Sequence, residues 1–578
     1  MSTPATKTVS ETLSDWAVEG FRAAFGDALT DTSMVGVVPA ANPQFGDYQC
    51  NAAMPLAKQL KKPPREVAAA FAAKAPPHPA VERMEIAGPG FINIHLNAGW
   101  IVERIQSMGA SSNLDVPQAG AGRTAVMDYG SPNITKPLHI GHLRSHNIGS
   151  VLDRLHRFIG WRVIADNHLG DWGTQFGITI MGYRHFGDPK AMAERPLEEL
   201  ERVYVRSYEK GEQDPEWREQ CRRELVKLQS GDADNLALWQ EFVRLSIEEL
   251  NRIYAVLGVK YDLWHGESYY RDRLAGVVDL LEKQGLAKPS EGATVVFLEE
   301  EKLPVCIVRK RDGGFNYATS DLATVAARVA DHRPDKIVYV TDERQQLHFR
   351  QIFAICRRLG YTVQLDHVWF GLMRLPEGTF STREGNVIRL DQLLDEAQAR
   401  ALKVVRETSP EMPPAQQERV ARAVGIGAVK YVDLSTSPQS LITFTWEKAL
   451  ALDGNSGPYL QYAHARIASV QDKYAERFPG KSPDAFPIRF TDPIERTLAL
   501  RMLRFPEVVV AAAQSYKPNV LTDYLYDLSQ VYSTFYQNVP FLKADEGVRE
   551  SRVRLCGLVA RVLKTGLTLL GIEAPERI

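Results

Sequence analysis

A repeated alternation of apolar, strand-like runs with amphipathic helical stretches is the feature that most restricts how this chain can fold. The run TAVMDY at 124–129 leads into a helical pattern at 141–160, and a second strand-like run, WRVIADN, follows directly. The same order returns with KIVYVTD at 336–342 and the helical stretch at 348–360. Strands that alternate with helices predict a parallel sheet with crossover helices. We therefore expect an α/β, Rossmann-like core over residues 116–391.

Three further regions surround or interrupt this core. Residues 1–115 combine two helical stretches with strand alternation in RMEIAGPGFINIHL, which predicts a small N-terminal α+β domain. A charged and strongly helical segment at about 190–260 separates the two strand–helix halves, and we expect it to be a helical insertion. Helical periodicity dominates residues 392–578 and predicts a C-terminal all-α helical bundle.

Composition excludes several classes of protein. The chain has 578 residues, 44% of them hydrophobic, and a formal net charge of -2, so a nucleic-acid partner would have to meet local basic patches. The five cysteines are an odd number without a Cys-x-x-Cys pair, which argues against a disulfide framework or a zinc ribbon. The sequence has no secretory signal pattern and no run of about 18 apolar residues, so we expect a cytoplasmic protein without a membrane segment.

The stretch SPNITKPLHIGHLRSHNIG, residues 131–149, lies where the first strand gives way to a helix. Ligands of open α/β sheets bind beyond the carboxyl ends of the strands, and a helix N-terminus favours an anion. Gly141 would let a phosphate approach the backbone, and His139 and His142 can donate hydrogen bonds to phosphate oxygens. Lys136 adds a cation just upstream. A single histidine near a helix start is more often a cap or a core residue, but two at this spacing form a far more specific signal.

His-x-Gly-His at a strand-to-helix junction is the signature of class I aminoacyl-tRNA synthetases and related nucleotidyltransferases. The stretch YGSPNITKPLHIGHLRSHNIG and the following DNHLGDWGTQFG resemble the arginyl-tRNA synthetases. GNSGPYLQYAHARI at 454–467 and the C-terminal TGLTLLGIEAPERI resemble the same family, so the likeness covers essentially the whole chain. The resemblance implies a class I synthetase core, an N-terminal domain that contacts the tRNA D-loop and a C-terminal anticodon-binding bundle.

The resemblance implies an arginine–tRNA ligase that works in two steps. The carboxylate of arginine attacks the α-phosphate of ATP to give arginyl-adenylate and pyrophosphate, and the terminal ribose hydroxyl of tRNA(Arg) then takes the arginyl group. No protein nucleophile is required, so catalysis rests on positioning and charge stabilisation. The expected partners are L-arginine, ATP with Mg²⁺ held through phosphates and water, and tRNA(Arg). We expect a monomer without a protein-ligated metal.

Two segments would contact ATP according to the resemblance. A second family signature, a loop that normally carries lysine, maps to FSTREGNVIRL, but its central part at 380–386 has no lysine. Lys136 stands where members with such a loop often carry a lysine, and we expect it to replace the missing one. The residues implied in ATP binding are His139, Gly141, His142, Ser381, Thr382 and Arg383. The residues implied in catalysis are His139, His142, Lys136 and Arg383.

Recognition of arginine requires a carboxylate for the planar guanidinium group. FNYATSDLATVAARV resembles the family segment that supplies a tyrosine and an aspartate, here Tyr317 and Asp321, which share one helix face. Asp321 alone would be interpreted as a solvated acid, and only the matching segment changes that interpretation. GDWGTQFG at 170–177 is expected to pack beneath the site. For Asp171, Trp172 and Gln175, the sequence leaves a structural role and a catalytic role equally open. The remaining residues implied in arginine binding are Ser131, Asn133, His142 and Gln345.

RNA contacts are expected at both ends of the chain. The candidates are Phe91 and Asn93 in the N-terminal domain and Tyr459, Tyr462, His464 and Arg466 in the bundle. Phe91 could stack on an exposed base, which is the usual way in which unpaired RNA is bound, although a core position in a strand is an equal alternative. Tyr532 and Tyr536 share one helix face and are interpreted as core residues.

Two other functions remain open at the level of sequence. One is a class I nucleotidyltransferase that never charges tRNA, although the N-terminal domain and the helical bundle would then have no purpose. The other is an inactive relative that acts as an RNA-binding protein, against which the complete set of His139, His142, Tyr317, Asp321 and Gln345 argues. Arginine-dependent exchange between ATP and pyrophosphate separates these alternatives.

Overall fold

The computed structural model describes residues 7–374, 376 and 389–578 of the chain. They form two compact units that interleave along the sequence. The first unit contains the chain up to residue 119 together with residues 459–568 and 574–578, and the second contains residues 120–458 and 569–573. The three-domain division predicted from the sequence is finer than these two units, and it stays a prediction.

The second unit is built on a four-stranded parallel sheet with the strand order β11-β10-β5-β6. Its strands are β5 (Thr124–Tyr129), β6 (Arg162–Asp166), β10 (Lys336–Asp342) and β11 (Gln364–Phe370). The chain passes from β5 to β6 on one side and later adds β10 on the other, so the strand order reverses between β5 and β10. Such a switch point is where ligands of open α/β sheets bind. The predicted parallel sheet is therefore confirmed.

Apolar packing on this sheet explains why these runs form strands. Val126 of β5 pairs in register with Ile337 of β10, and both side chains are fully buried. They share a core cluster with Leu322 and Ile355 of the two helices that precede and follow β10. The helices beside the sheet are α5 (Ile140–Phe158), α13 (Tyr317–His332) and α14 (Gln346–Arg358). A parallel sheet covered in this way requires nearly continuous apolar strands, as the sequence has.

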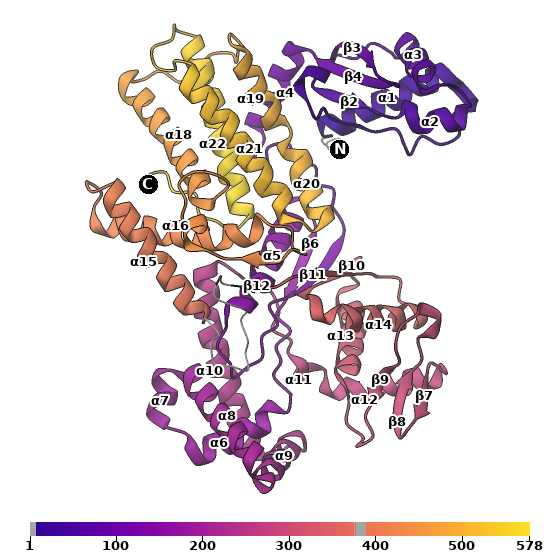
Figure 1. Cartoon of the computed structure of the whole chain (residues 1–578), viewed down its shortest axis with the longest axis vertical. Helices are drawn as coiled ribbons and strands as arrows, with labels where there is room; N and C mark the ends of the chain where they lie inside the picture. Colours follow the sequence, from indigo (N-terminus) through magenta and orange to yellow (C-terminus); the bar gives the residue numbers. More distant parts are fainter. Residues whose placement is uncertain (1–6, 375, 377–388) are drawn as a thin grey trace. The chain divides into compact units, whose positions relative to one another are not determined.

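Five helices form the insertion between the two halves of the sheet, and Figure 1 shows them gathered in one group. They are α6 (Gln175–Phe186), α7 (Pro189–Glu194), α8 (Pro196–Gln213), α9 (Pro215–Gln229) and α10 (Ala233–Leu257). The helical region begins earlier than the expected position near 190, because α6 packs against α8 and α9. A methyl group at Gly177 would lie 2.2 Å from a backbone oxygen of α9, so the absence of a side chain allows this close packing.

A small antiparallel sheet with the order β7-β8-β9 follows the insertion and is not among the elements that the sequence predicts. The elements of this region are α11 (Glu267–Tyr270), α12 (Leu274–Lys283), β7 (Ala287–Ser290), β8 (Ala293–Val296) and β9 (Cys306–Arg309). Each strand has four residues, and β7 reads AKPS, so neither length nor alternation marks it as a strand.

Helices α15 and α16 complete the second unit and pack against each other. The remaining elements of this unit are β12 (Met373–Arg374), α15 (Leu390–Thr408), α16 (Pro414–Leu434), β13 (Ile442–Thr443) and α17 (Trp446–Ala449). Most of this region lies beyond position 392, where the sequence predicts the C-terminal bundle to begin, yet it belongs to the unit that contains the parallel sheet.

The first unit contains the predicted N-terminal α+β domain, whose sheet has the order β1-β2-β4-β3 and is antiparallel throughout. Its core is aromatic, because Trp16 and Phe21 of α1 both contact the ring of Phe71. The elements are α1 (Val9–Phe25), β1 (Val37–Pro39), β2 (Tyr48–Cys50), α2 (Ala53–Leu60), α3 (Pro64–Lys74), β3 (Val81–Ala87), β4 (Phe91–Leu96) and α4 (Ala98–Ala110).

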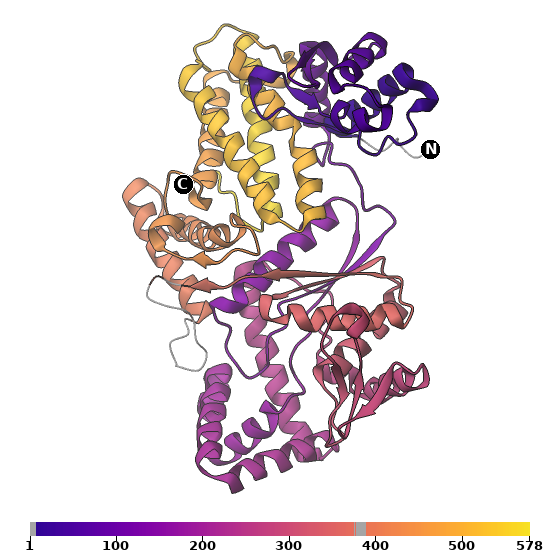
Figure 2. The same ribbon diagram turned by 45° about the vertical axis from the view of Figure 1, so that its right-hand side comes forward.

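The helical bundle of the first unit confirms the predicted all-α C-terminal region, and its yellow helices run side by side in Figure 2. The helices are α18 (Gly457–Arg477), α19 (Pro493–Leu503), α20 (Phe505–Ser515), α21 (Pro518–Asn538) and α22 (Val548–Leu569). The apolar stretch RTLALRMLRFPEVVVAAAQ is divided into α19 and α20 at Arg504, because Pro506 stands in the first turn of α20 and cannot continue a helix. Among the described helices, none has the length and apolar character needed to cross a membrane.

A buried ion cluster joins α13 to the ends of two strands of the parallel sheet. Arg328 Nη2 of α13 donates to Asp128 Oδ2 of β5 at 2.7 Å and to Asp166 Oδ2 of β6 at 2.8 Å. All three side chains are at most 6% exposed. Burial raises the pKa of Asp166, but the Arg328 guanidinium outweighs it and leaves that pKa below its ordinary value. The cluster therefore holds α13 in a fixed position on the sheet.

Removal of one carboxylate from this cluster should strongly destabilise the second unit. We expect Asp166→Ala to lower the free energy of unfolding by about 3–5 kcal/mol, because Arg328 loses a partner while it remains buried. Glu241→Ala is the matched control: Glu241 forms an exposed pair with Arg244 and should cost less than about 1 kcal/mol. Urea denaturation followed by circular dichroism measures both changes. Equal losses in the two variants would contradict the assigned importance of the cluster.

Candidate active site

A cavity of about 870 Å³ opens in the second unit at the carboxyl ends of β5 and β10. This is the switch point of the sheet, and the volume lies in the range of ligand-binding pockets. Eight of the residues that the sequence predicts to bind ligands line this cavity. They are Ser131, Asn133, His139, Gly141, His142, Tyr317, Asp321 and Gln345. Segments that are nearly two hundred residues apart in the sequence thus meet at one place, as the fold requires.

The turn after β5 is held in an unusual backbone conformation. Ser131 and Thr135 have φ values of 47° and 75°, a region that residues with a side chain seldom adopt. Ser131 is fixed there by two bonds, since its Oγ donates to Asp128 Oδ1 at 2.8 Å and its N–H donates to Asn167 Oδ1 at 3.0 Å. Gly130 is required because a methyl group would lie 2.3 Å from the hydroxyl of Tyr261. The strained turn therefore holds Ser131 at the cavity wall.

His139 and His142 begin helix α5 as an interlocked pair. The Nδ1 atom of His139 accepts a hydrogen bond from the N–H of Gly141 at 3.0 Å, and Nδ1 of His142 accepts from the N–H of His139 at 3.1 Å. Because both Nδ1 atoms act as acceptors, the proton of each neutral ring resides on Nε2. The ring centroids are 3.8 Å apart and the ring planes are tilted by 39°, so the two rings are in close contact. Each Nε2 is thereby a hydrogen-bond donor.

Both rings are neutral near pH 7. Burial, followed by the charges of Lys136 and Arg344, lowers the pKa of His139 to about 4. Burial is also the main reason why the pKa of His142 lies well below its ordinary value. The pair therefore offers N–H groups rather than full charges, and the positive field at this end of the cavity comes from the N-terminus of α5 and from nearby Lys and Arg side chains.

The GDWGTQFG segment supports the cavity, as the sequence predicts. Gly170 forms a bridge with Asn133, and a methyl group at Gly170 would lie 2.2 Å from the Asn133 side-chain oxygen. The carboxylate of Asp171 accepts hydrogen bonds from the N–H and the hydroxyl of Ser268. Trp172 packs edge-on against Trp239, and the amide of Gln175 donates to the Gly170 carbonyl. These contacts are structural ones within the unit.

The cavity is also lined by carboxylates. Tyr317 and Asp321 lie one turn apart at the start of α13, and Tyr317 is 68% exposed. His348 of α14 contacts Asp321, with its Nε2 2.5 Å from Asp321 Oδ2. Gln345 ends the short helix η5 (Glu343–Gln345), directly after β10. Helix α13 therefore brings Tyr317 and Asp321, the pair that the sequence predicts to bind the guanidinium, to the cavity. One carboxylate oxygen of Asp321 is in contact with His348.

Glu267 lines the cavity near this pair and is not among the residues that the sequence predicts. It begins the short helix α11 in the stretch HGESYY, which has no periodic pattern and no motif that would identify it. Burial raises the pKa of Glu267 to about 7, helped by the carboxylates of Asp171 and Asp321 and opposed by His168. A cationic ligand would restore the charge of such a carboxyl group. His348 and Arg344 are further cavity residues that the sequence reasoning does not include.

Some expected site residues lie elsewhere. Lys136 does not line the cavity, and its ammonium group lies over the ring of Tyr204 in α8, 4.6 Å from the centroid. Ser381, Thr382 and Arg383, together with the loop at 380–386, fall outside the described residues. Within the described ranges, no group of three or more His, Cys, Asp or Glu is arranged to hold a metal ion.

The RNA candidates of the first unit differ in exposure. Asn93 is 2% exposed and accepts a hydrogen bond from Gln49, so its side chain is not offered to a partner in this structure, whereas Phe91 is half-buried. In the bundle, the Arg466 guanidinium lies 5.5 Å from the ring centroids of both Tyr462 and Tyr536. The hydroxyl of the half-buried Tyr459 accepts a hydrogen bond from Gln530. His464 is 4% exposed, and Tyr532 is 1% exposed, as expected for a core residue.

Three family models match successive parts of the chain. They are described as "Arginyl tRNA synthetase N terminal domain" for residues 6–96, "tRNA synthetases class I (R), catalytic domain" for 104–446 and "DALR anticodon binding domain" for 460–578. The cavity lies entirely within the range of the catalytic-domain model.

Curated relatives match over nearly the full length. The chain is 44% identical to an arginine–tRNA ligase of Fusobacterium nucleatum subsp. nucleatum, over 93% of this chain and 94% of that protein. It is 42% identical to an arginine–tRNA ligase of Cellvibrio japonicus, over 94% and 95% of the two chains. The solved arginyl-tRNA synthetase of Thermus thermophilus superimposes with a TM-score of 0.85 at 26% identity, over 99% of this chain and 100% of that one.

Proposed function

Because the chain belongs to the class I arginyl-tRNA synthetases and is an arginine–tRNA ligase, we propose that its cavity binds arginine at the carboxylate-rich end and ATP at the histidine end. The enzyme joins L-arginine to tRNA(Arg) for protein synthesis. The observation that carries the proposal is that eight residues from three separate segments of the sequence line this one cavity, at the switch point of the sheet. Their individual roles follow from their chemistry.

Three groups recognise the guanidinium of arginine in this proposal. Asp321 and Glu267 supply the carboxylates, and Tyr317 supplies a hydroxyl and an aromatic ring at the same end of the cavity. A planar guanidinium has five N–H donors, which suits two carboxylates that approach from different elements, α13 and α11. A smaller or uncharged amino acid would leave these partly buried acids without the guanidinium as a partner, and this is the basis of specificity in this proposal.

The α-amino and carboxylate groups of arginine then lie toward the strained turn and the histidine pair. Ser131 and Asn133 follow β5, Gln345 follows β10, and His142 begins α5, so all four meet the substrate between its side chain and ATP. Polar groups that surround the reacting carboxylate hold it in line with the α-phosphate, and this positioning lowers the barrier to reaction.

The histidine end binds the phosphates of ATP in this proposal. The Nε2–H donors of His139 and His142 and the N-terminus of α5 stabilise charge that grows on the phosphate oxygens. Gly141 keeps this approach open, and Lys136 adds a cation in place of the lysine that the 380–386 loop lacks. Ser381, Thr382 and Arg383 of that loop are proposed as further ATP contacts on the family resemblance.

Adenylate formation follows from this arrangement without a protein nucleophile. An oxygen of the arginine carboxylate forms a bond to the α-phosphorus, and the bond to the pyrophosphate oxygen breaks. In this proposal Mg²⁺ would enter with ATP, held by phosphate oxygens and water. The ribose hydroxyl of tRNA(Arg) then attacks the carbonyl carbon of the adenylate, and AMP leaves.

The bundle of the first unit is proposed to bind the anticodon region of tRNA. Arg466 and the partly exposed Tyr462 form a cationic and aromatic surface on α18, extended by Tyr536 of α21. Such a surface suits unpaired bases and phosphates. Tyr459 lies on the same helix, and Phe91 is proposed as a contact of the N-terminal domain. Asn93, which the sequence also predicts as a contact, is buried and bonded to Gln49, so it does not offer its side chain to RNA in this structure.

We also propose that the enzyme acts as a monomer in the cytoplasm. The five cysteines are buried and free, as suits a reducing compartment.

The guanidinium assignment predicts a selective loss of arginine recognition. Asp321→Asn should lower kcat/KM for arginine at least about a hundredfold, or about 2.7 kcal/mol, because the guanidinium loses a charged partner in a partly buried site. The KM for ATP should change by less than about twofold, and Asp331→Asn, on the exposed side of α13, serves as the control. Steady-state aminoacylation of tRNA(Arg) measures these constants. A loss confined to ATP, or no loss, would contradict the assignment.

Glu267 predicts a pH dependence of arginine binding. Its pKa of about 7 means that at lower pH a proton must leave the carboxyl group before the guanidinium pairs with it. The affinity for arginine should therefore rise with pH, with Kd about tenfold higher at pH 6 than at pH 8. Glu267→Gln should bind arginine more weakly at pH 8 and lose this dependence. Calorimetry at several pH values tests this, and a Kd of the unaltered enzyme that is constant from pH 6 to 8 would refute it.

The bundle surface predicts a salt-sensitive contribution to tRNA binding. Arg466→Ala should raise the Kd for tRNA(Arg) about threefold to tenfold and reduce the slope of log K against log salt concentration by about 1. Arg477→Ala, at the exposed end of the same helix, should change Kd by less than about twofold. Filter binding across a series of salt concentrations measures both quantities. An unchanged Kd and slope for Arg466→Ala would contradict an RNA contact at this residue.

A further inference from the structure

One face of helix α8, in the insertion, contacts the two chain segments that flank His139. Glu198, Glu201 and Tyr204 follow at three-residue intervals, so they lie near one another on the helix surface. The carboxylate of Glu198 pairs with the Arg389 guanidinium, with 3.0 Å between Oε1 and Nη1. The ring of Tyr204 lies under the ammonium group of Lys136 at 4.6 Å. We refer to these three residues as the α8 face.

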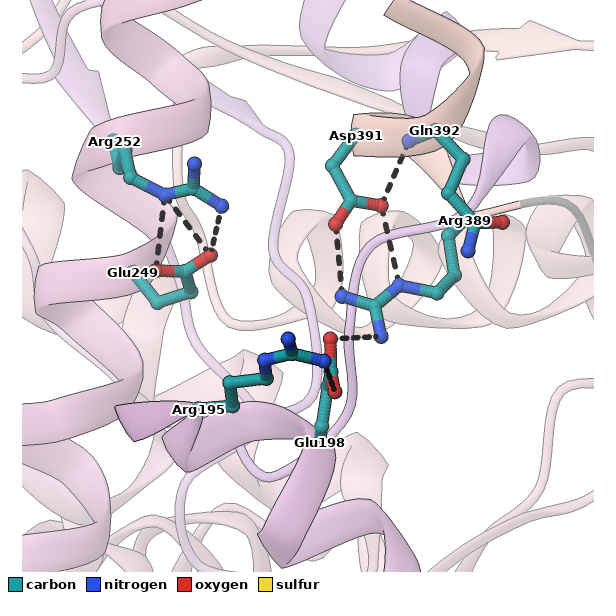
Figure 3. Close-up of polar contacts among 7 residues, drawn as sticks. All are labelled: Arg195, Glu198, Glu249, Arg252, Arg389, Asp391 and Gln392. Atoms are coloured by element: carbon teal, nitrogen blue, oxygen red, sulfur yellow. Dashed lines mark hydrogen bonds and ion pairs between the residues drawn. The ribbon is translucent and has the colours of Figure 1, made fainter. Parts of the chain in front are cut away.

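Arg389 connects this face to the histidine motif through its backbone. It forms an antiparallel bridge with His139, and the N–H of the next residue, Leu390, donates to the carbonyl of Leu138 at 2.8 Å. Its guanidinium also donates to both oxygens of Asp391, at 3.1 and 2.8 Å, as Figure 3 shows. The Arg389 side chain is 23% exposed, so solvent screens these pairs only in part. One residue thus joins the insertion, the start of α15 and the segment of His139.

Glu201 occupies the middle of the α8 face and supports this geometry. Its pKa is raised by burial, and the charges of Arg389 and Lys136 both oppose the increase. A partly buried carboxyl group that responds to both cations must lie near both. The α8 face therefore places Glu198 against Arg389 and Tyr204 against Lys136, with Glu201 near both cations.

Another ion pair in Figure 3 makes no such connection. Glu249 and Arg252 pair within helix α10, three residues apart. Pairs of this kind stabilise a helix by a few tenths of a kcal/mol and fix no other segment. The pair of Glu198 and Arg389 instead joins residues nearly two hundred positions apart, one of which is bonded to the backbone of the histidine motif.

We propose that Arg389 is a positioning residue for adenylate formation, and that the α8 face holds Arg389 and Lys136 on either side of His139. The inference rests on the ATP-side roles proposed for His139 and Lys136. Arg389 acts through His139: by fixing the backbone of that residue, it sets the direction in which the Nε2 donors of the pair point toward phosphate. The insertion thereby supports the ATP end of the cavity, whereas the guanidinium end is built on α11 and α13.

The test compares four variants of the full-length enzyme in aminoacylation of tRNA(Arg), with ATP and arginine titrated separately. Glu198→Gln and Arg389→Gln remove the pair one partner at a time, and their double variant measures coupling. Arg389→Lys retains the charge but lacks the planar guanidinium fork that bonds both oxygens of Asp391 and also reaches Glu198. Glu248→Gln, which loses only an exposed pair within α10, is the control. Lys136→Ala is measured beside them as a reference, and thermal unfolding midpoints verify that each variant is folded.

We expect Glu198→Gln and Arg389→Gln each to lower kcat/KM for ATP about fivefold to tenfold, with KM for arginine changed less than about twofold. The double variant should lose little more than Arg389→Gln alone, and Arg389→Lys should be intermediate. Equal losses for ATP and arginine, or an additive double variant, would overturn the inference. If Lys136→Ala loses at least about tenfold while the Glu198 and Arg389 variants match the control, the inference fails and the proposed role of Lys136 stands. If Lys136→Ala also matches the control, that role fails too.

Discussion

The buried ion pairs of Arg328 are the constraint on which the site depends. A charge removed from water is tolerated in a protein only when it is paired, and Arg328 finds its partners at the ends of two neighbouring strands, Asp128 on β5 and Asp166 on β6. This requirement fixes how α13 lies on the sheet. Asp321 is seven residues before Arg328 on the same helix face, and Ser131 bonds to the second oxygen of Asp128. The same cluster therefore positions groups proposed for both ends of the arginine molecule.

The groups that line the cavity differ in electrostatic character, and this contrast suits the reaction that we propose. The carboxyl groups proposed to bind arginine include Glu267, whose pKa is raised because it is buried beside other carboxylates. The groups proposed to bind ATP are neutral imidazoles whose donors are fixed by backbone hydrogen bonds, together with the N-terminus of α5. In this proposal the cationic side chain and the anionic triphosphate bind to different groups, and the reacting groups meet between them. Catalysis by positioning alone requires this order.

Much of the fold follows from local sequence patterns, and the remainder depends on long-range contacts. The strands of the sheet and helix α5 carry apolar periodicity, and the His139 motif identifies the switch point, so these are predictable. Strands β7 to β9 have only four residues each, which is too short to show a pattern, and β7 is also polar. Glu267 has no motif around it, because only the folding of α11 beneath α13 brings it to the cavity. Lys136 and Arg389 show the same limit: their partners in α8 are close in space and distant in sequence.

A structure of the enzyme with a non-hydrolysable analogue of arginyl-adenylate tests the central claim most directly, because it places both substrates at once. The account predicts the guanidinium within hydrogen-bonding distance of Asp321 and Glu267, and the group in place of the α-phosphate beside His139 and His142. A guanidinium bound at the histidine end, or an analogue bound outside the cavity at the β5 and β10 switch point, would contradict it.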